Sequence, residues 1–125
     1  MISQRIKGYK DLKFWQKSFE TTKQIVGLVK KLPMEQATKI VVNQLIRASS
    51  SVGANIAEGY GRYRGKEYER FLQISLGSAN ETEYWLLILK ELYPKIGATI
   101  DKIIGINNET VGMLVSSLKT LRNKR

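Results

Sequence analysis

The sequence predicts an all-α protein that folds as an antiparallel up-and-down four-helix bundle. Apolar residues recur at intervals of three and four along four long segments, and no segment shows the alternation typical of a strand. The two prolines, Pro33 and Pro94, fall where helical patterns stop. Because four helices with short connections pack most simply as a bundle, we expect a single domain over 1–125. Its ends are an N-terminal segment over 1–10 and a basic tail over 122–125.

The first helix is predicted to begin at Asp11 and to end before Pro33. A carboxylate at Asp11 can cap the helix by accepting hydrogen bonds from the free amides of the first turn. Lys30 and Lys31 suit the last turn, because cations are favoured at the negative end of the helix dipole. The predicted inward stripe is Leu12, Trp15, Phe19, Thr22, Val26 and Val29.

The second helix is predicted over 35–58, and its C-terminal half consists mostly of small residues. Gly53 alone costs up to about 1 kcal/mol of helix propensity relative to alanine, so we expect a neighbouring helix to pack closely there. The predicted inward stripe is Thr38, Val41, Val42, Leu45, Ala48, Val52 and Ile56. The glycines Gly59, Gly61 and Gly65 end the helix and build a turn, with one of the first two as the C-cap.

The third helix is predicted from Lys66 to Leu92 or Tyr93, and Pro94 ends it. The fourth helix is predicted over 99–121, with an inward stripe of Ile100, Ile103, Ile104, Val111, Leu114, Leu118 and Leu121. The middle of this last helix contains residues that weaken it, namely Gly105, Asn107 and Asn108. A kink or a split at this point is therefore an alternative to one continuous helix.

The composition excludes several classes of function. The chain has neither histidine nor cysteine, so zinc, copper and iron sites lose their usual ligands, and disulfides are excluded. The commonest general base near neutral pH is also missing, and no paired acidic motif stands out, so we predict no enzyme, no cofactor and no bound metal. The longest apolar run, Trp85–Leu89, cannot span a bilayer, and no signal peptide is present. These features favour a cytoplasmic protein.

The net charge of +10 is unevenly distributed along the chain, with +7 over 1–47, −1 over 48–93 and +4 over 94–125. A basic protein of this size attracts polyanions such as nucleic acids. The alternative is that the lysines only keep the helix faces soluble.

Aromatic and basic residues alternate in the glycine turn, which reads GYGRYRGK over 59–66. Arginines can bind phosphates and tyrosines can stack on bases, although the same residues also suit a plain connection between helices. With the lysines near the start of the first helix, the residues predicted to contact nucleic acid are Lys10, Lys13, Lys17, Tyr60, Arg62, Tyr63, Arg64 and Lys66.

Arg47 and Glu81 fall close to one level of the second and third helices, counted outward from the glycine turn. We expect a partly buried ion pair that fixes the register of the two helices, and a polar ligand site is the alternative. Asn55 and Glu58 share a helix face and are expected to satisfy backbone groups of the following turn. The predicted structural polar cluster is therefore Arg47, Asn55, Glu58 and Glu81.

The segment YWLLILKELY over 84–93 has more apolar residues than a bundle helix needs. Such a surplus is either buried in a second interface or exposed as a patch. We predict a homo-oligomer whose interface uses the range 85–92 together with Phe14, Trp15 and Phe19. A binding face for another protein is the alternative.

Three groups of residues carry a resemblance to a known family. The first is YKDL over 9–12 with WQK over 15–17, and the second is QL, RA, SV, NIAEG and GR between 44 and 62. The third is FL, IS and GS between 71 and 78, followed by Glu81. With these motifs the chain resembles the 23S rRNA intervening-sequence proteins, a family of bacterial four-helix bundles.

The resemblance implies a small cytosolic bundle that assembles as a pentamer, because related bundles form five-membered rings. It also implies a link to RNA, since some members are encoded within inserts of large-subunit rRNA genes, and it supplies no catalytic residues. Distant relatives are accessory factors of retroelement reverse transcriptases. We therefore predict a non-catalytic oligomeric protein that binds structured RNA, such as rRNA, or other nucleic acid through basic surfaces. The alternative is a protein-interaction scaffold or accessory factor without nucleic-acid contact.

Overall fold

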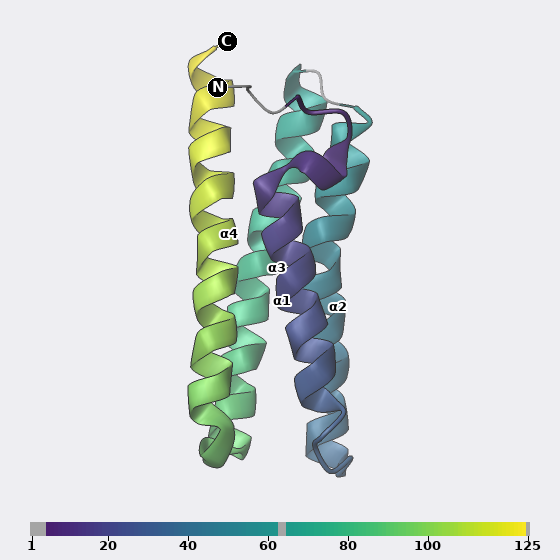
Figure 1. The fold of residues 1–125 in the computed structure, drawn as a ribbon, viewed down its shortest axis with the longest axis vertical. Coiled ribbons are helices and arrows are strands. Elements are labelled where there is room, and N and C mark those ends of the chain that lie inside the picture. Colours follow the sequence, from purple (N-terminus) through teal and green to yellow (C-terminus); the bar gives the residue numbers. More distant parts are fainter. Residues whose placement is uncertain (1–4, 63–64, 125) are drawn as a thin grey trace.

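The chain folds into four long helices in the computed structural model, which describes residues 5–62 and 65–124. The elements, in order, are η1 (Tyr9–Asp11), α1 (Lys13–Val29), α2 (Gln36–Tyr60), α3 (Gly65–Leu92), η2 (Pro94–Ile96) and α4 (Gly97–Asn123), where η marks a short 3-10 turn. Neighbouring helices run in opposite directions (Figure 1). Since no strand occurs in the described part of the chain, the predicted all-α four-helix bundle is confirmed.

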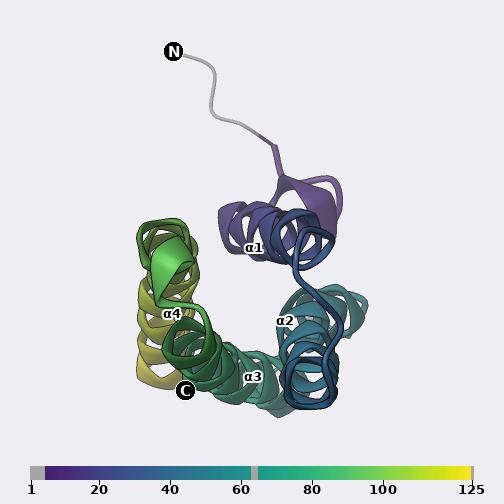
Figure 2. The same ribbon diagram turned by 90° about the horizontal axis from the view of Figure 1, so that it is seen from below.

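Seen along the bundle, the helices form a ring in the order α1, α2, α3, α4 (Figure 2). The neighbouring pairs are α1–α2, α2–α3, α3–α4 and α1–α4, and within the described ranges the backbones of the diagonal pairs stay more than 8 Å apart, measured between Cα atoms. One end of the bundle holds the start of α1, the α2–α3 connection and the end of α4 (Figure 1). We call it the turn end and the opposite end the far end.

The inward face of α1 differs from the predicted one. Its buried residues are Phe14, Ser18, Thr21, Ile25, Leu28 and Val29, so only Val29 of the predicted stripe is buried. Phe19 is 54% exposed. The buried stripe contains Ser18 and Thr21, which a search for apolar residues does not select. The prediction instead followed the aromatic residues Trp15 and Phe19, which lie on the neighbouring face of the helix.

The inward stripe predicted for α2 is confirmed at all of its positions. The helix ends at Tyr60, and Gly61 is its C-cap with a right-handed φ of −65°, so the predicted glycine cap is also confirmed. Gly65 has a φ of +56°, a conformation that favours glycine, and it is the first residue of α3. In α4, four residues of the predicted stripe are buried, and the other three, Ile104, Val111 and Leu121, are half-buried. Asn107 and Thr110 are also buried, although they were not in the predicted stripe.

Asp11 does not cap α1, contrary to the prediction. It closes η1, and its Oδ2 accepts hydrogen bonds from the backbone N–H groups of Lys7 (2.7 Å) and Gly8 (3.1 Å). The N-cap of α1 is Leu12, which has no side-chain acceptor. The carboxylate therefore stabilises the entry into the bundle instead of the first turn of α1.

The weakened middle of α4 does not split the helix, which continues from Gly97 to Asn123. Asn107 is 2% exposed, and its Nδ2 donates to the backbone carbonyl of Ala79 on α3 at 2.9 Å. This contact binds α4 to its neighbour where its own propensity is lowest. The predicted alternative of two pieces is therefore wrong.

Two apolar clusters fill the core, one toward each end of the bundle. Ile25, Leu45, Leu86 and Ile103 belong to the far-end cluster, and Phe14, Ile56, Leu72 and Leu114 belong to the turn-end cluster. In every helix a buried polar residue lies between members of the two clusters, and these residues are Thr21, Ser49, Thr82 and Asn107. The three hydroxyl groups donate to carbonyls of their own helices, so this polar level is largely satisfied locally.

Candidate nucleic-acid interface

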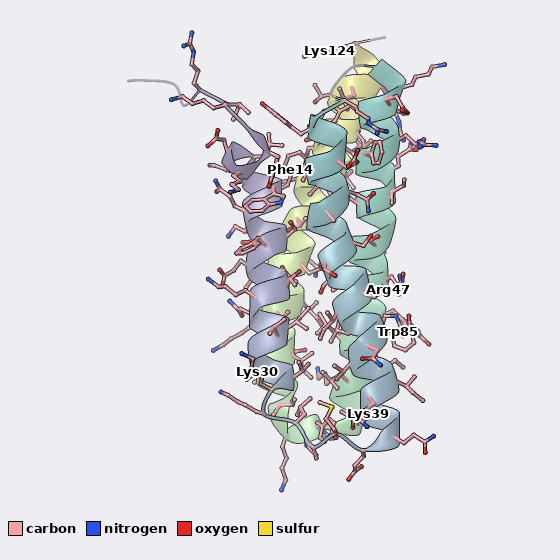
Figure 3. The ribbon with its side chains drawn as sticks, turned by 90° about the vertical axis from the view of Figure 1, so that its right-hand side faces the viewer. Phe14, Lys30, Lys39, Arg47, Trp85 and Lys124 are labelled. Atoms are coloured by element: carbon pink, nitrogen blue, oxygen red, sulfur yellow. The ribbon has the colours of Figure 1, made fainter. Side chains whose placement is uncertain are left out.

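Positive charge concentrates at the turn end of the bundle. This end comprises residues 5–16, 54–62, 65–75 and 112–124. Ser18 lies against Gly53 and Ser75 bonds Val52, which aligns the first three segments, and Leu114 and Leu118 of the fourth pack in one cluster with Phe14 and Leu72. It carries ten basic and four acidic residues, a net charge of +6, whereas all other described residues together carry nine basic and seven acidic residues, a net charge of +2. In Figure 3, Lys124 lies at this end, and Lys30 and Lys39 lie at the other.

Several of the predicted contact residues lie together at this end. Lys10, Lys13, Arg62 and Lys66 are exposed, and Tyr60 is half-buried. The predicted contacts Tyr63 and Arg64 fall outside the described residues. The sequence thus identified cations from two separate segments, Lys10 and Lys13 in one and Arg62 and Lys66 in the other, that the bundle places at one end.

Some of these cations are already paired. Lys17 Nζ lies 2.9 Å from Glu109 of α4, and Arg62 Nη2 lies 3.2 Å from Glu58. The Arg62 guanidinium also lies 5.5 Å from the centre of the Phe71 ring, a cation–π distance. Arg70 and Arg122 pair with Glu67 and Glu69, respectively. The acidic groups of the turn end therefore neutralise arginines and leave most of the lysines available.

Seven basic residues of this end have no ion-pair partner in the described part of the chain, and we call them its free cations. They are Arg5, Lys7, Lys10, Lys13, Lys66, Lys119 and Lys124. Sequence reasoning missed Lys7, Lys119 and Lys124 as contact candidates. The +4 charge of the segment 94–125 was the available signal, but only the fold shows that the end of α4 lies at the same end of the bundle as the start of α1.

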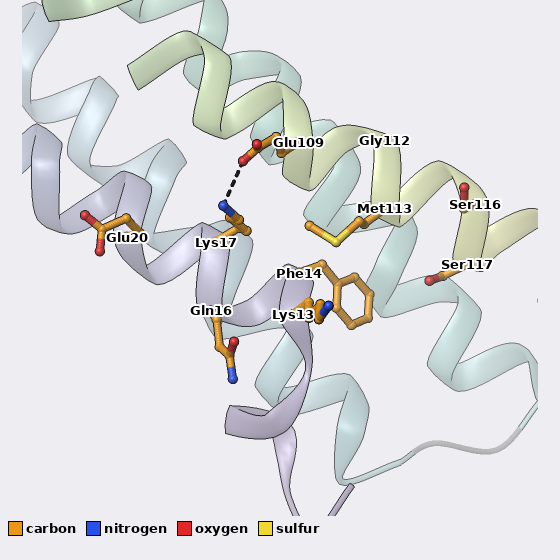
Figure 4. A pocket seen from close by; sticks show the side chains of 10 residues that line it. All are labelled: Lys13, Phe14, Gln16, Lys17, Glu20, Glu109, Gly112, Met113, Ser116 and Ser117. Carbon is orange, nitrogen blue, oxygen red and sulfur yellow. Dashed lines mark ion pairs between the residues drawn. The ribbon is translucent and has the colours of Figure 1, made fainter. Parts of the chain in front are cut away.

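A groove of about 990 Å³ runs along the seam between α1 and α4 (Figure 4). Phe14 and Met113 supply its apolar side chains, and Gly112 lowers the α4 wall because an added Cβ there would meet no atom within 4 Å. Lys17 and Glu109 form an ion pair across the seam. The groove was not predicted, because its residues come from helices at opposite ends of the sequence.

The remaining polar lining of the groove comes from both helices, with Gln16 and Glu20 on α1 and Ser116 and Ser117 on α4. The hydrogen bond from Gln24 lowers the pKa of Glu20. Desolvation raises this pKa by less, and the positive charge of Lys23 lowers it further. Glu20 is therefore an ionised acceptor near neutral pH. The groove thus offers an apolar floor with donors and acceptors along its edges.

Arg47 and Glu81 form an ion pair across the α2–α3 seam, but the pair is not buried. The Arg47 and Glu81 side chains are 56% and 37% exposed. Gln44 Oε1 accepts from the Nε (3.1 Å) and Nη2 (2.9 Å) atoms of Arg47, and Trp85 Nε1 donates to Glu81 Oε2 at 3.0 Å. Glu81 is half-buried as a residue and Arg47 is exposed, so the expected partial burial holds for the glutamate and not for the arginine.

Asn55 and Glu58 do not join this network. Asn55 Nδ2 donates to the carbonyl (2.8 Å) and hydroxyl (3.0 Å) oxygens of Ser51, and Ser51 Oγ lies 3.0 Å from Ser78 Oγ on α3. Asn55 therefore bonds Ser51 of its own helix instead of the following turn, and it is Ser51 that links α2 to α3. Glu58 pairs with Arg62. The four residues predicted as one cluster make three separate contacts.

The candidate interface residues for self-association divide into two groups. Phe14 is 6% exposed, so its ring packs mainly in the bundle core and offers little surface to a second copy. Phe19 is exposed and stacks on Trp15, with ring centres 5.1 Å apart. On α3, Trp85 is half-buried, while Tyr84, Leu87 and Leu92 are 55%, 47% and 42% exposed.

The described residues show no grouping of acidic side chains that could hold a metal ion. Over the same ranges, no helix has an apolar stretch long enough to cross a bilayer.

Comparison with known proteins places the chain in a family. Residues 10–116 match the 23S rRNA-intervening sequence protein family, and no curated protein matches the chain. The fold is similar to the 1.70 Å crystal structure of a protein with unknown function from the S23 ribosomal protein family of Bacteroides thetaiotaomicron, with 33% identity and a TM-score of 0.77. That alignment covers 85% of this chain and 98% of the other. Because the family match spans most of its length, the chain belongs to the 23S rRNA-intervening sequence protein family.

Proposed function

We propose that this protein is a non-catalytic, cytoplasmic homo-oligomer that binds structured RNA or other nucleic acid through the turn end of its bundle. The observation that carries the proposal is the net charge of +6 at this end, against +2 for the rest of the described residues. Phosphate groups are the ligand class that such a surface attracts, because binding them releases counterions.

The arrangement of the lysines supports this proposal. Lys10, Lys66 and Lys119 come from three different elements and are exposed without an ion-pair partner in the described ranges. Lysines on several elements can contact successive phosphates of one nucleic-acid backbone. The half-buried Tyr60 can in addition contact a base with the edge of its ring. Nothing among these residues forms a base-reading helix, so binding should depend on nucleic-acid shape and charge more than on sequence.

Self-association would multiply this charge. The exposed Tyr84, Leu87 and Leu92 lie on α3, and the exposed Ile40 lies on α2, so an apolar surface outside the bundle core is available for a second copy. We propose a ring of five copies, as the resemblance to pentameric bundles implied. Such a ring would have a formal charge of about +50.

Fluorescence anisotropy with a labelled RNA hairpin and a labelled DNA duplex tests the proposal. The variant Lys10→Glu/Lys66→Glu reverses two free charges at the turn end, and Lys30→Glu/Lys39→Glu makes the same charge change at the far end. We expect log affinity to fall with log salt by about 0.7 to 0.9 per neutralised phosphate. The turn-end variant should lose about tenfold or more in affinity at low salt, and the far-end variant should lose much less. Absence of wild-type binding at about 50 mM salt would overturn the proposal.

A second candidate function is a protein-interaction scaffold. It is favoured by the same exposed side chains Tyr84, Leu87 and Leu92, which could bind another protein instead of a second copy. This function predicts a partner that stays bound at high salt, because apolar contacts are not screened. Size-exclusion chromatography with light scattering distinguishes the two uses of the face: a monomer in solution would leave it open for another protein.

A further inference from the structure

We infer that the groove between α1 and α4 binds one unpaired base of a single-stranded nucleic-acid segment. The inference rests on the proposed nucleic-acid binding and adds a site within it. The groove lies on the turn-end half of the seam, and Lys13 lines it (Figure 4). Lys13 has no ion-pair partner among the described residues, so its ammonium group is available for the phosphate beside a bound base.

The shape of the groove suits a flat ring. Its volume of about 990 Å³ is sufficient for a nucleobase with its sugar. The half-buried Met113 supplies most of the apolar surface for a face of the ring, and Phe14, which is 6% exposed, adds only a small part of its own ring. The thioether of Met113 is polarizable and flexible, which favours contact with an aromatic system. Because Gly112 has no side chain, a ring can approach the backbone of α4 closely.

The edges of the groove suit the polar rim of a base. Gln16 donates its amide to the carbonyl of Lys10 at 2.8 Å, which leaves its side-chain oxygen as an acceptor. The hydroxyls of Ser116 and Ser117 can both donate and accept. A base has donors and acceptors along its edge and apolar faces, so it can use the floor and the rim of the groove together.

A helix from a partner protein fits less well. The Lys17–Glu109 ion pair, at 2.9 Å, connects the two walls of the groove. An extended helix lying along the seam would have to break this contact, whereas a single ring inserted beside it would not. The short apolar floor of Phe14 and Met113 also matches one ring better than the repeated anchors of an amphipathic helix.

The test compares two probes of equal length and charge. One is a labelled single-stranded RNA of about 12 nucleotides, and the other is the same chain without bases, so the ratio of their affinities reports base recognition separately from phosphate attraction. We expect the wild type to bind the first probe about tenfold more tightly, as for stacking of one base.

Gly112→Leu fills the groove, and Gly105→Leu is its matched control. Both glycines lie in α4, are exposed and have open space at the Cβ position, but only Gly112 lines the groove. Gly112→Leu should bring the affinity ratio close to one while the salt dependence remains, and Gly105→Leu should keep the wild-type ratio. Met113→Gln, which retains the side-chain volume but removes the apolar floor, should also lower the ratio.

Each result decides the matter. A wild-type ratio of one, or an unchanged ratio in Gly112→Leu with intact helix content by circular dichroism, would overturn the base site and leave the proposed function standing. If Gly112→Leu does not fold, an unchanged ratio in Met113→Gln would overturn the site. Absence of wild-type binding to either probe at low salt would overturn both proposals.

Discussion

The seams α2–α3 and α1–α4 lie on opposite sides of the bundle and are built in different ways. At α2–α3, Gly59 packs so closely that an added Cβ would stand 2.7 Å from the Cβ of Phe71. At α1–α4, an added Cβ on Gly112 would meet nothing within 4 Å. Glycine in one seam therefore brings two helices together, and glycine in the other leaves space for a ligand.

The polar groups of the two seams differ in the same way. Across α2–α3, the Ser75 hydroxyl donates to the carbonyl of Val52 at 2.9 Å, and Ser51 contacts Ser78 at 3.0 Å. Across α1–α4, the Lys17–Glu109 ion pair is the only polar side-chain link between described residues. The α2–α3 seam is therefore closed by several polar contacts between its helices, whereas Gln16 and Glu20 of the α1–α4 seam bond within their own segment and not across the seam.

The largest expected effect comes from Gly59→Ala. Because the Cβ of Phe71 cannot move without its helix, the added methyl group should force α2 and α3 apart and destabilise the protein by about 1 to 3 kcal/mol. The matched change Gly112→Ala should stabilise it by up to about 1 kcal/mol through helix propensity. Urea unfolding at one fixed protein concentration measures the unfolding free energy of both variants. Equal values for the two would contradict the conclusion that α2 and α3 pack closely at Gly59 while α1 and α4 leave space at Gly112.

A smaller change in stability is expected from Thr110, which lies one turn of α4 after Asn107 of the polar level. Thr110 is fully buried, and in the described part of the chain its hydroxyl has no hydrogen-bond partner. Thr110→Val removes this group at nearly constant volume and should stabilise the protein by about 1 kcal/mol. Thr82→Val is the control, because the Thr82 hydroxyl already donates to Ser78 at 2.8 Å and its loss should bring no gain. Equal unfolding free energies for the wild type and Thr110→Val would contradict the expectation.

The ion pairs that cross the two seams should contribute less still. Arg47–Glu81 and Lys17–Glu109 are both solvent-exposed, so each coupling energy should lie below about 1 kcal/mol. Arg47–Glu81 should be the stronger, because Gln44 and Trp85 hold its two partners in place. Double-mutant cycles with alanine at each position measure both energies. A larger coupling for Lys17–Glu109 would mean that the α1–α4 seam is the more rigid one.

The sequence predicted the helices well because helical periodicity is a local property. The stripe of α2 could be identified since it is made of valine, leucine and isoleucine, whereas that of α1 was wrong because Ser18 and Thr21 are buried in it. The weak middle of α4 is bonded to α3 through Asn107 and Ala79, a contact between residues far apart in the sequence. Propensity alone could not show that this bond compensates for a weak helix.

The candidate site was predictable only in part, for a related reason. Lys10 and Lys13 stood out within one short basic segment. The groove beside them needs Met113 and Gly112, which are about one hundred residues away and face α1 only because the four helices close into a ring. Local patterns therefore identified the charge of the site, and the fold supplied its shape.

The smallest expected effect is a loss of stability at high pH from the turn end of the α2–α3 seam. Burial raises the pKa of the Tyr68 phenol, with a further contribution from Tyr60, and the Tyr68 ring lies beside Gly59. The folded protein therefore favours the neutral phenol, while the unfolded chain ionises near the ordinary value of about 10. The stability that this group contributes is complete below pH 10 and is lost as the pH rises through the folded-state pKa.

Tyr68→Phe tests this dependence, because phenylalanine keeps the ring and removes the titrating group. The unfolding free energy of the wild type relative to the variant should be constant between about pH 7 and pH 9 and should fall above about pH 10. Urea titrations of both proteins at each pH give this difference in unfolding free energy. The contributions of other groups that titrate in this range are common to the two proteins and cancel in the difference. Parallel pH profiles would show that the phenol is as accessible to ionisation in the folded protein as in the unfolded chain. The turn end of the α2–α3 seam would then be looser than its glycine contact implies.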